Sequence, residues 1–225
     1  MIKFTDYLKL TTLWYYSMSI PILVSNFNLF SLVNFLYRKE VLVGAKNGDK
    51  YWIRNLMDLW ALKEVLINNV YKFDTTIKYK NIVDVGSALG DFSIMASKVS
   101  DKVYSFDPGS DEAVLIRKNL SLNGIKNVVF EKKEVNTLDD IFNKYSIKKC
   151  DFLKIDCEGD EYVIFGNTKD KTLAKIIKIS FEIHLFKKEH HKKYNALKQR
   201  LKKLNFKIIE EDNPVHPYLK YLYAF

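Results

Sequence analysis

The sequence is poor in glycine, proline and cysteine, and each shortage excludes a class of protein. Eight glycines and four prolines among 225 residues lie below the usual contents of about 7% and about 5%, which excludes collagen-like and low-complexity chains. The two cysteines, Cys150 and Cys157, are too few for a secreted disulfide framework, and no Cys/His cluster has the spacing of a zinc site. We therefore expect a cytoplasmic protein.

The residues that are abundant exclude a disordered chain. Hydrophobic residues make up 48% and aromatic residues 14% of the sequence, enough to bury a core in one domain of ordinary size. The 36 Lys and Arg residues exceed the 27 Asp and Glu residues, so the net charge is +9. This excess favours anionic partners but does not determine the fold.

Basic residues concentrate between Lys187 and Lys207, where nine of them accompany a single acid, Glu189. The spacing of Tyr194, Leu197 and Leu201 predicts that this stretch is an amphipathic helix. One interpretation of its charges is an ordinary solvated helix face. The other is a patch that binds nucleic acid or lipid headgroups, with nucleic acid the less favoured partner.

No charged residue occurs between Leu10 and Tyr37, and this run is long enough to cross a membrane. Polar residues dilute it, and no small-residue cleavage site follows a short apolar core, so a removed signal peptide is not expected. Pro21 predicts two short helices that break near it. Three interpretations stay open: helices packed on the domain or on a second copy in a homodimer, a peripheral membrane contact through residues 10–37, and a membrane span.

Residues 41–79 are predicted to form a β-hairpin followed by a helix. Two extended runs within Val41–Arg54 flank Asn47-Gly48, the dipeptide typical of type I′ turns. Apolar residues then recur at helical spacing from Leu56 to Tyr71. We therefore divide the chain into an apolar helical segment at 1–40, a hairpin and helix cap at 41–79, and a cofactor-binding domain at 80–225.

From residue 80 onward strands and helices alternate, which indicates a parallel sheet with crossover helices. Helices are expected from about Asp91 to Val99 and from Ser110 to Asn123. A short connection joins the last two strands, which predicts that they pair antiparallel. The expected strands are Asn81–Val85, Lys102–Phe106, Val128–Glu131, Phe152–Ile155, Ile176–Ile183, Phe206–Glu210 and Tyr218–Phe225.

The loop after the first of these strands has the composition of a nucleotide-type site. Gly86 allows a sharp turn and close approach of a ligand to the backbone; Ser87 follows it, and Gly90 permits close entry into the helix. Asp107 ends the next strand, where a carboxylate can accept hydrogen bonds from both hydroxyls of a ribose. These residues predict a cofactor that contains adenosine.

S-adenosylmethionine suits the charges of this loop better than a dinucleotide does. Ala88 stands where a glycine would make room for a pyrophosphate, and Asp91 would place negative charge near phosphates. S-adenosylmethionine has no phosphate and carries an ammonium and a sulfonium, which the carboxylate of Asp84 could favour. The alternative is that Asp84 caps amides of the loop.

Five segments resemble the FkbM-type S-adenosylmethionine-dependent methyltransferases, and the resemblance covers about residues 41–225. The most specific segment is Leu153–Glu161, which reads LKIDCEGDE; the others are Asp84–Gly90, Val103–Pro108, Leu138–Ile141 and Glu182–His184. The sequence departs from the family at Ala88, Asp107 and Asp160. The resemblance implies an α/β fold with a Rossmann-like, seven-stranded class I methyltransferase sheet whose last strand is antiparallel, and methylation of hydroxyl oxygens, often on sugars or other small metabolites.

Acids after the fourth strand and polar residues in the fifth suit methyl transfer to an alcohol. Asp156 and Glu158 belong beyond the carboxyl end of the sheet, where ligands bind, so we expect Asp156 to contact both the cofactor and the reacting groups. Glu182 and His184 point to one side of their strand, because side chains alternate with period two. His184 is the expected general base.

Two alternatives stay open for these carboxylates. In the first, Asp156 and Glu158, with Glu182 as a further ligand, hold a divalent cation, for which Mg²⁺ is suited. In the second, the carboxylates cap helices and pair with lysines, and have no chemical role.

The sequence thus predicts an S-adenosylmethionine-dependent O-methyltransferase that acts on a hydroxyl of a sugar, glycolipid or other small metabolite. An RNA-modifying methyltransferase that uses the basic helix at 187–207 is the first alternative. A non-catalytic module of the same fold, which recruits a membrane or a partner through residues 1–40, is the second. The expected location is cytoplasmic, with membrane association as a variant.

Overall fold

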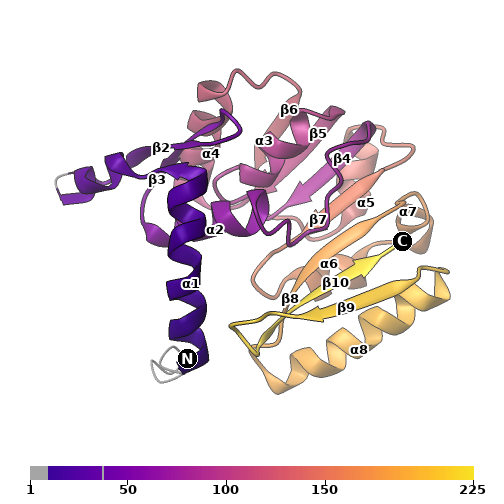
Figure 1. Ribbon diagram of the computed structural model, residues 1–225. Coiled ribbons are helices and arrows are strands. Elements are labelled where there is room, and N and C mark those ends of the chain that lie inside the picture. The colour runs from indigo at the N-terminus through magenta and orange to yellow at the C-terminus, as the bar shows by residue number, and fades with distance from the viewer. Residues whose placement is uncertain (1–9, 37) are drawn as a thin grey trace.

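One seven-stranded sheet forms the centre of the molecule (Figure 1). The computed structural model describes residues 10–36 and 38–225. In their order across the sheet, the strands are β6 (Val128–Lys132), β5 (Ser100–Asp107), β4 (Tyr79–Val85), β7 (Phe152–Ile155), β8 (Ile179–His184), β10 (Leu219–Ala224) and β9 (Ile208–Asp212). The pairs from β6 to β8 are parallel, whereas β10 runs antiparallel to both neighbours. The predicted sheet with an antiparallel last strand is confirmed.

Helices cover both faces of this sheet, because its strands are apolar on both sides. Val83 and Val85 face a core formed with α5 (Leu138–Lys144), α6 (Glu161–Asn167), α7 (Asp170–Leu173) and α8 (Lys188–Lys203). Ile82 points the other way, toward α2 (Leu56–Leu66) and α3 (Asp91–Ser97). The helix α4 (Ser110–Leu122) shares a further hydrophobic core with Ile94 of α3.

One predicted helix ends earlier in the structure, and one predicted strand begins later. The helix expected over Leu56–Tyr71 stops at Leu66, because Asn69 and Lys72 adopt positive φ angles of 48° and 49°, which a right-handed helix cannot contain. The strand expected from Ile176 begins at Ile179, and Ile176 makes only an isolated bridge to Cys150. Ile176 is apolar because it is buried in the core, not because it belongs to the strand.

The basic stretch forms the predicted amphipathic helix, α8. Tyr194, Leu197 and Leu201 are buried against the sheet. Lys198 pairs with Glu210, and Arg200 pairs with Asp170. Most of the remaining lysines of the helix are exposed.

The hairpin shares a hydrophobic core with α3 and α4. β2 (Val41–Ala45) and β3 (Lys50–Ile53) pair antiparallel, and β1 (Phe27–Asn28) adds to β2. Asn119 of α4 is completely buried; its Oδ1 accepts a hydrogen bond from Trp52 N at 2.7 Å, and its Nδ2 donates to Trp52 O and to Leu89 O. The amide of Asn119 therefore connects the hairpin, α4 and the loop before α3.

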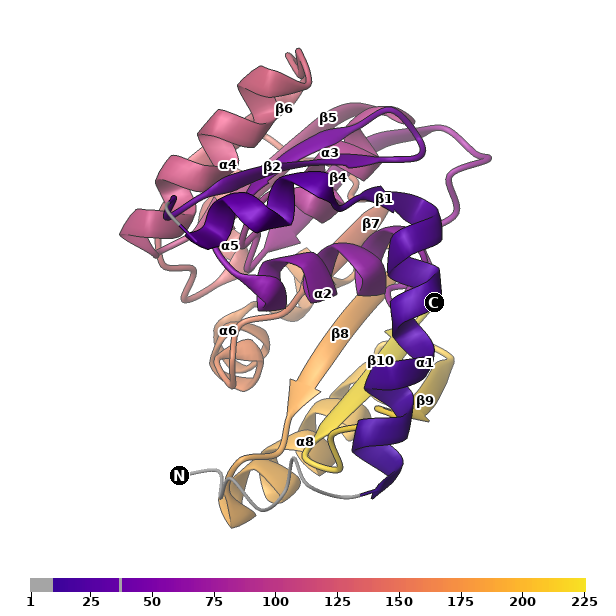
Figure 2. The same cartoon turned by 60° about the vertical axis from the view of Figure 1, so that its left-hand side comes forward.

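The predicted break at Pro21 is wrong. One helix, α1 (Leu10–Asn26), runs through Pro21 and is followed by a 3₁₀ helix, η2 (Phe30–Leu36). Pro21 lies on the exposed side of α1, where losing one backbone hydrogen bond does not end the helix. Tyr15 and Tyr16 of α1 pack against Trp60 of α2, and both views show the two helices side by side (Figures 1 and 2).

No helix among the described residues combines the length and the apolar character needed to cross a membrane. The flanking residues Lys3 and Lys9 lie outside the described part of the chain.

Asn119→Ala should destabilise the protein by about 3 kcal/mol, because the backbone groups of Trp52 and Leu89 lose their buried partners. Urea denaturation would measure the change. Asn195→Ala, at an exposed position of α8, should change the free energy of unfolding by less than about 0.5 kcal/mol. Equal effects of the two substitutions would contradict this account of the hairpin.

Candidate active site

The site begins at the turn that follows β4. Gly86 has a φ angle of +81°, and a Cβ atom there would lie 1.6 Å from the carbonyl oxygen of Asp156. Its backbone N–H donates to Phe106 O at 2.9 Å. Glycine is required because this turn lies directly against the backbone at the end of β7.

Three residues predicted to bind the cofactor, Asp84, Ser87 and Gly90, make contacts that support this turn. Asp84 is completely buried and accepts a hydrogen bond from Ser93 Oγ at 2.6 Å. Ser87 is also buried and bonds to Phe106 O and to Ser105 Oγ. Gly90 packs against Ile116 with a φ angle of +84°. None of the three lines the cavity described below.

A buried lysine neutralises the acids around the turn. Lys154 Nζ lies 3.2 Å from Asp84 Oδ1 and 3.8 Å from Asp156 Oδ2, and it donates to Gly86 O. Burial alone would lower the pKa of Lys154, but Asp84 and Asp156 raise it above its ordinary value. The amine is therefore a fixed positive charge between β4 and β7.

Asp107 has the position expected of a ribose-binding acid. It ends β5, and its two carboxylate oxygens accept hydrogen bonds from the backbone N–H groups of Ala88 and Gly109 at 3.0 and 2.9 Å. Burial raises its pKa, and these two hydrogen bonds oppose the rise. The carboxylate is held in one orientation, and it retains lone pairs for a ligand.

A cavity of about 460 Å³ extends along the carboxyl ends of these strands. Gly86, Asp107 and Asp156, all predicted from the sequence, lie in its wall. Phe106, Pro108 and Glu158 also line it and belong to segments that the sequence singled out, whereas Glu112, Val135 and Ile164 carried no such signal. Apolar side chains beside a few acids suit a ligand with a flat apolar ring and polar hydroxyls.

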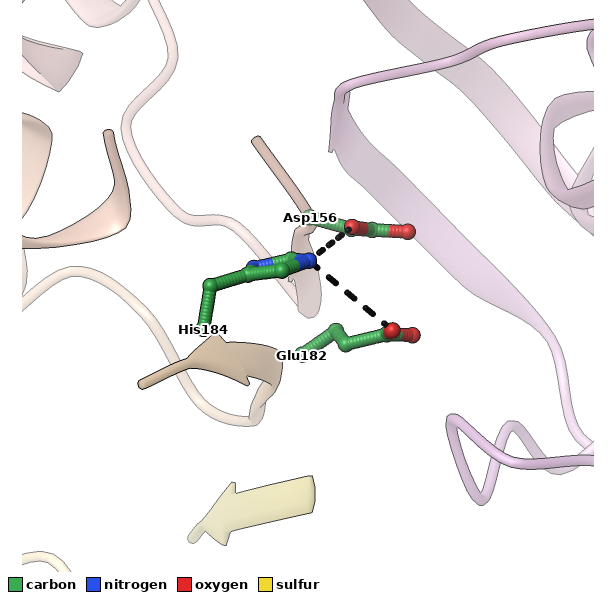
Figure 3. Close-up of side chains that lie close together, drawn as sticks. All are labelled: Asp156, Glu182 and His184. Atoms are coloured by element: carbon green, nitrogen blue, oxygen red, sulfur yellow. Dashed lines mark ion pairs between the residues drawn. The ribbon is translucent and has the colours of Figure 1, made fainter. Parts of the chain in front are cut away.

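Asp156, directly after β7, converges with Glu182 and His184 in the last part of β8 (Figure 3). His184 Nε2 lies 3.9 Å from Asp156 Oδ1 and 3.9 Å from Glu182 Oε1. Glu182 and His184 share one side of β8, as their spacing predicted. Glu158 comes within 3.6 Å of the same nitrogen, although its side chain is 82% exposed.

Two buried residues hold this cluster in place. Glu161, with no exposed surface, accepts hydrogen bonds from the backbone N–H groups of His184 and Gly159, and its Oε1 lies 3.4 Å from His184 Nδ1. Tyr71 donates a hydrogen bond to Asp156 Oδ2 at 2.7 Å. Sequence reasoning missed Tyr71, because it lies far from β7 in the chain and no motif marks it.

The cluster controls the charge of its own histidine. Burial alone would lower the pKa of His184, but Glu161 and Asp156 raise it to about 9. Burial raises the pKa of Glu182 above its ordinary value. In this arrangement His184 carries a proton at neutral pH, and a protonated imidazole cannot accept a second one.

A second cavity, of about 310 Å³, opens on the other side of the cluster. Glu182 and His184 lie in its wall. Carboxylates, aromatic rings and other polar groups from distant segments also line it: Trp60, Glu64, Glu158, Phe186, Asn213, His216 and Tyr218. Glu158 lines both cavities, so the two meet at its side chain. Burial raises the pKa of Glu64 to about 7. No sequence pattern marks Glu64, because α2 reaches the site only through tertiary packing.

Comparison with known proteins agrees with this geometry. Residues 43–208 match the family described as the methyltransferase FkbM domain. The comparison with curated proteins found no match.

Solved structures that resemble this chain include proteins described as methyltransferases or methylases. The protein SMU.1697c of Streptococcus mutans, described as a methyltransferase in complex with SAH, has a TM-score of 0.53 and 16% identity, covering 71% of this chain and 97% of its own. Fibrillarin of Aeropyrum pernix, with natively bound S-adenosyl-L-methionine, has a TM-score of 0.50 and 12% identity, covering 84% and 95%. At these identities the likeness concerns the fold. The family match shows that this chain belongs to the FkbM methyltransferase family, and it is therefore an S-adenosylmethionine-dependent methyltransferase.

Proposed function

We propose that this protein methylates a hydroxyl oxygen of a sugar, glycolipid or other small metabolite. The observation that carries the proposal is the second cavity, which joins the first at Glu158 and combines carboxylates with aromatic rings. Carboxylates accept hydrogen bonds from hydroxyl groups. Rings such as Trp60 and Tyr218 offer apolar faces to the carbon skeleton of a polar acceptor.

The first cavity suits S-adenosylmethionine. Gly86 lets the turn pack directly against the backbone of Asp156, where a Cβ atom would collide, and Asp107 presents an oriented carboxylate for the ribose hydroxyls. Asp156, between the two cavities, supplies negative charge near the cofactor's cationic part. When bound, S-adenosylmethionine supplies a methyl group on a sulfonium, and transfer to oxygen leaves a neutral thioether.

The residues between the cavities orient the acceptor and remove its proton. We assign the general base to Glu158 and not to His184, because Glu158 lines both cavities and its side chain is 82% exposed, whereas His184 is buried among carboxylates and lines one cavity. As the acceptor oxygen forms its bond to the methyl carbon, its proton passes to the Glu158 carboxylate and then to water. Glu182 and His184 line the acceptor side and position the hydroxyl.

RNA is the alternative acceptor, and the exposed lysines of α8 motivate it. No residue of α8 belongs to the wall of either cavity among the described residues. This separation favours a small acceptor that enters the second cavity.

We also propose that α1 contacts a second copy of the chain or a membrane surface. Trp14, Met18 and Val24 are more than half exposed on this helix, and apolar groups of this size favour burial. Deleting residues 1–38 should lower the mass in solution or abolish binding to liposomes, measured by ultracentrifugation and flotation. If neither property changes, the proposal is refuted.

Methyl-labelled S-adenosylmethionine, incubated with the protein and a cell extract, tests the acceptor class. We expect the label in an ether of a carbohydrate, glycolipid or small metabolite. Glu158→Gln should lower the rate by at least about 100-fold, because it removes the base, whereas Glu189→Gln on the exposed face of α8 should leave it unchanged. Label in RNA, with binding that falls steeply as salt rises, would establish the alternative.

Gly86→Ala should abolish cofactor binding measured by isothermal titration, because the new Cβ collides with the carbonyl of Asp156. Gly166→Ala is a matched control, since nothing lies within 4 Å of a Cβ atom there. It should bind S-adenosylmethionine as the unchanged protein does. Thermal melting of both variants separates lost binding from lost folding. Unchanged affinity in Gly86→Ala, or binding of NAD(H) in place of S-adenosylmethionine, would contradict this assignment of the cavity.

A further inference from the structure

We propose that Asp156, Glu182 and His184 form a binding site for one divalent cation. Each residue offers one ligand atom, and the three atoms lie within 4.8 Å of one another. The sequence suggested a carboxylate site built on Asp156 and Glu158, with Glu182 as a further ligand. The geometry keeps Asp156 and Glu182 and places the imidazole of His184 between them (Figure 3).

The distances suit ligands that share an ion. His184 Nε2 is 3.9 Å from both Asp156 Oδ1 and Glu182 Oε1, too far for hydrogen bonds, which have lengths of about 2.7–3.2 Å. Two ligands that each bind an ion at about 2.1 Å lie about 3.0–4.2 Å apart, depending on the angle between them. The observed separations fall within that interval.

The histidine provides an independent observation. His184 is 2% exposed, its Nδ1 makes no hydrogen bond among the described residues, and its Nε2 lies 3.6–3.9 Å from three carboxylate oxygens, beyond hydrogen-bond length. Nε2 is directed toward the two carboxylates (Figure 3). A buried polar side chain without a hydrogen bond is costly, and a cation at this position would supply the missing partner.

The residues behind the cluster have the arrangement of an outer coordination shell. Metal-binding histidines usually direct the second ring nitrogen to a carboxylate, as His184 Nδ1 does toward Glu161 at 3.4 Å. Tyr71 occupies Oδ2 of Asp156 and leaves Oδ1 for the ion. Lys154 also faces Oδ2, and its charge is balanced by Asp84.

The ligand set and its surroundings define the ion and its role. One imidazole with two carboxylates suits Mn²⁺, Mg²⁺ or Zn²⁺, and the ion takes the place of the proton on Nε2. Glu182 and His184 line the acceptor cavity, so the free coordination positions face it. There the ion would bind the acceptor hydroxyl and weaken its O–H bond, and the proton would pass to Glu158. This role rests on the proposed function, whereas cation binding does not.

Titration of the full-length protein, stripped with EDTA and free of S-adenosylmethionine, with Mn²⁺ tests the site. Calorimetry and the electron paramagnetic resonance signal of free Mn²⁺ should report one ion per chain. Glu182→Gln and Asp156→Asn should each weaken binding by at least about tenfold, because each removes a charged ligand with little change in shape. Asp101→Asn, exposed at the far end of β5, should bind Mn²⁺ as the unchanged protein does.

Absence of Mn²⁺ binding would overturn the cation site, and so would equal affinity in Glu182→Gln and Asp101→Asn. Hydroxyl methylation at full rate in EDTA would overturn the ion's role in activating the hydroxyl, and would leave the proposed function intact. If Mn²⁺ binds at these residues but the labelled product is not an ether, the cation site is supported and the proposed function fails.

Discussion

A single buried ammonium group holds together the middle of the sheet. Lys154 lies on β7 and faces Asp84 of β4 and Asp156 at the end of β7. An unpaired charge at this depth would cost several kcal/mol, so its partners must keep their places. Its bond to the carbonyl of Gly86 fixes the turn as well. Both cavities open from this edge, so the positions of cofactor and acceptor depend on the same ion pairs.

The rest of the site contains more acidic than basic side chains. Asp156, Glu158, Glu161 and Glu182 all lie within 4 Å of His184. Water would ordinarily screen the repulsion between these carboxylates, but burial limits the screening. The raised pKa of Glu182 reflects the cost of holding a negative charge there. A cationic ligand relieves the repulsion. The site is therefore suited to a sulfonium on one side and, under our proposal, to a metal ion on the other.

Sequence reasoning succeeded where chemistry is local and failed where it depends on packing. The glycine turn, Asp107 and the pair Glu182 and His184 follow from strand ends and from the period of two in a strand. Tyr71 and Glu64 could not be found in this way, because only tertiary packing brings them to the site. The continuous helix through Pro21 shows the same limit, since the effect of a proline on a helix depends on which side of the helix faces solvent.

The two cavities are built from different parts of the chain. The wall of the first, cofactor cavity comes from the ends of β4, β5 and β7 and from the segments that follow these strands and β6. Of the two cavities, α2 and residues 213–219 line only the second, acceptor cavity. Substitutions in α2 or in that last connection can therefore change which molecule is held without disturbing the turn at Gly86. The fold separates the choice of substrate from the chemistry, so new specificities can evolve, or be engineered, on an unchanged catalytic edge.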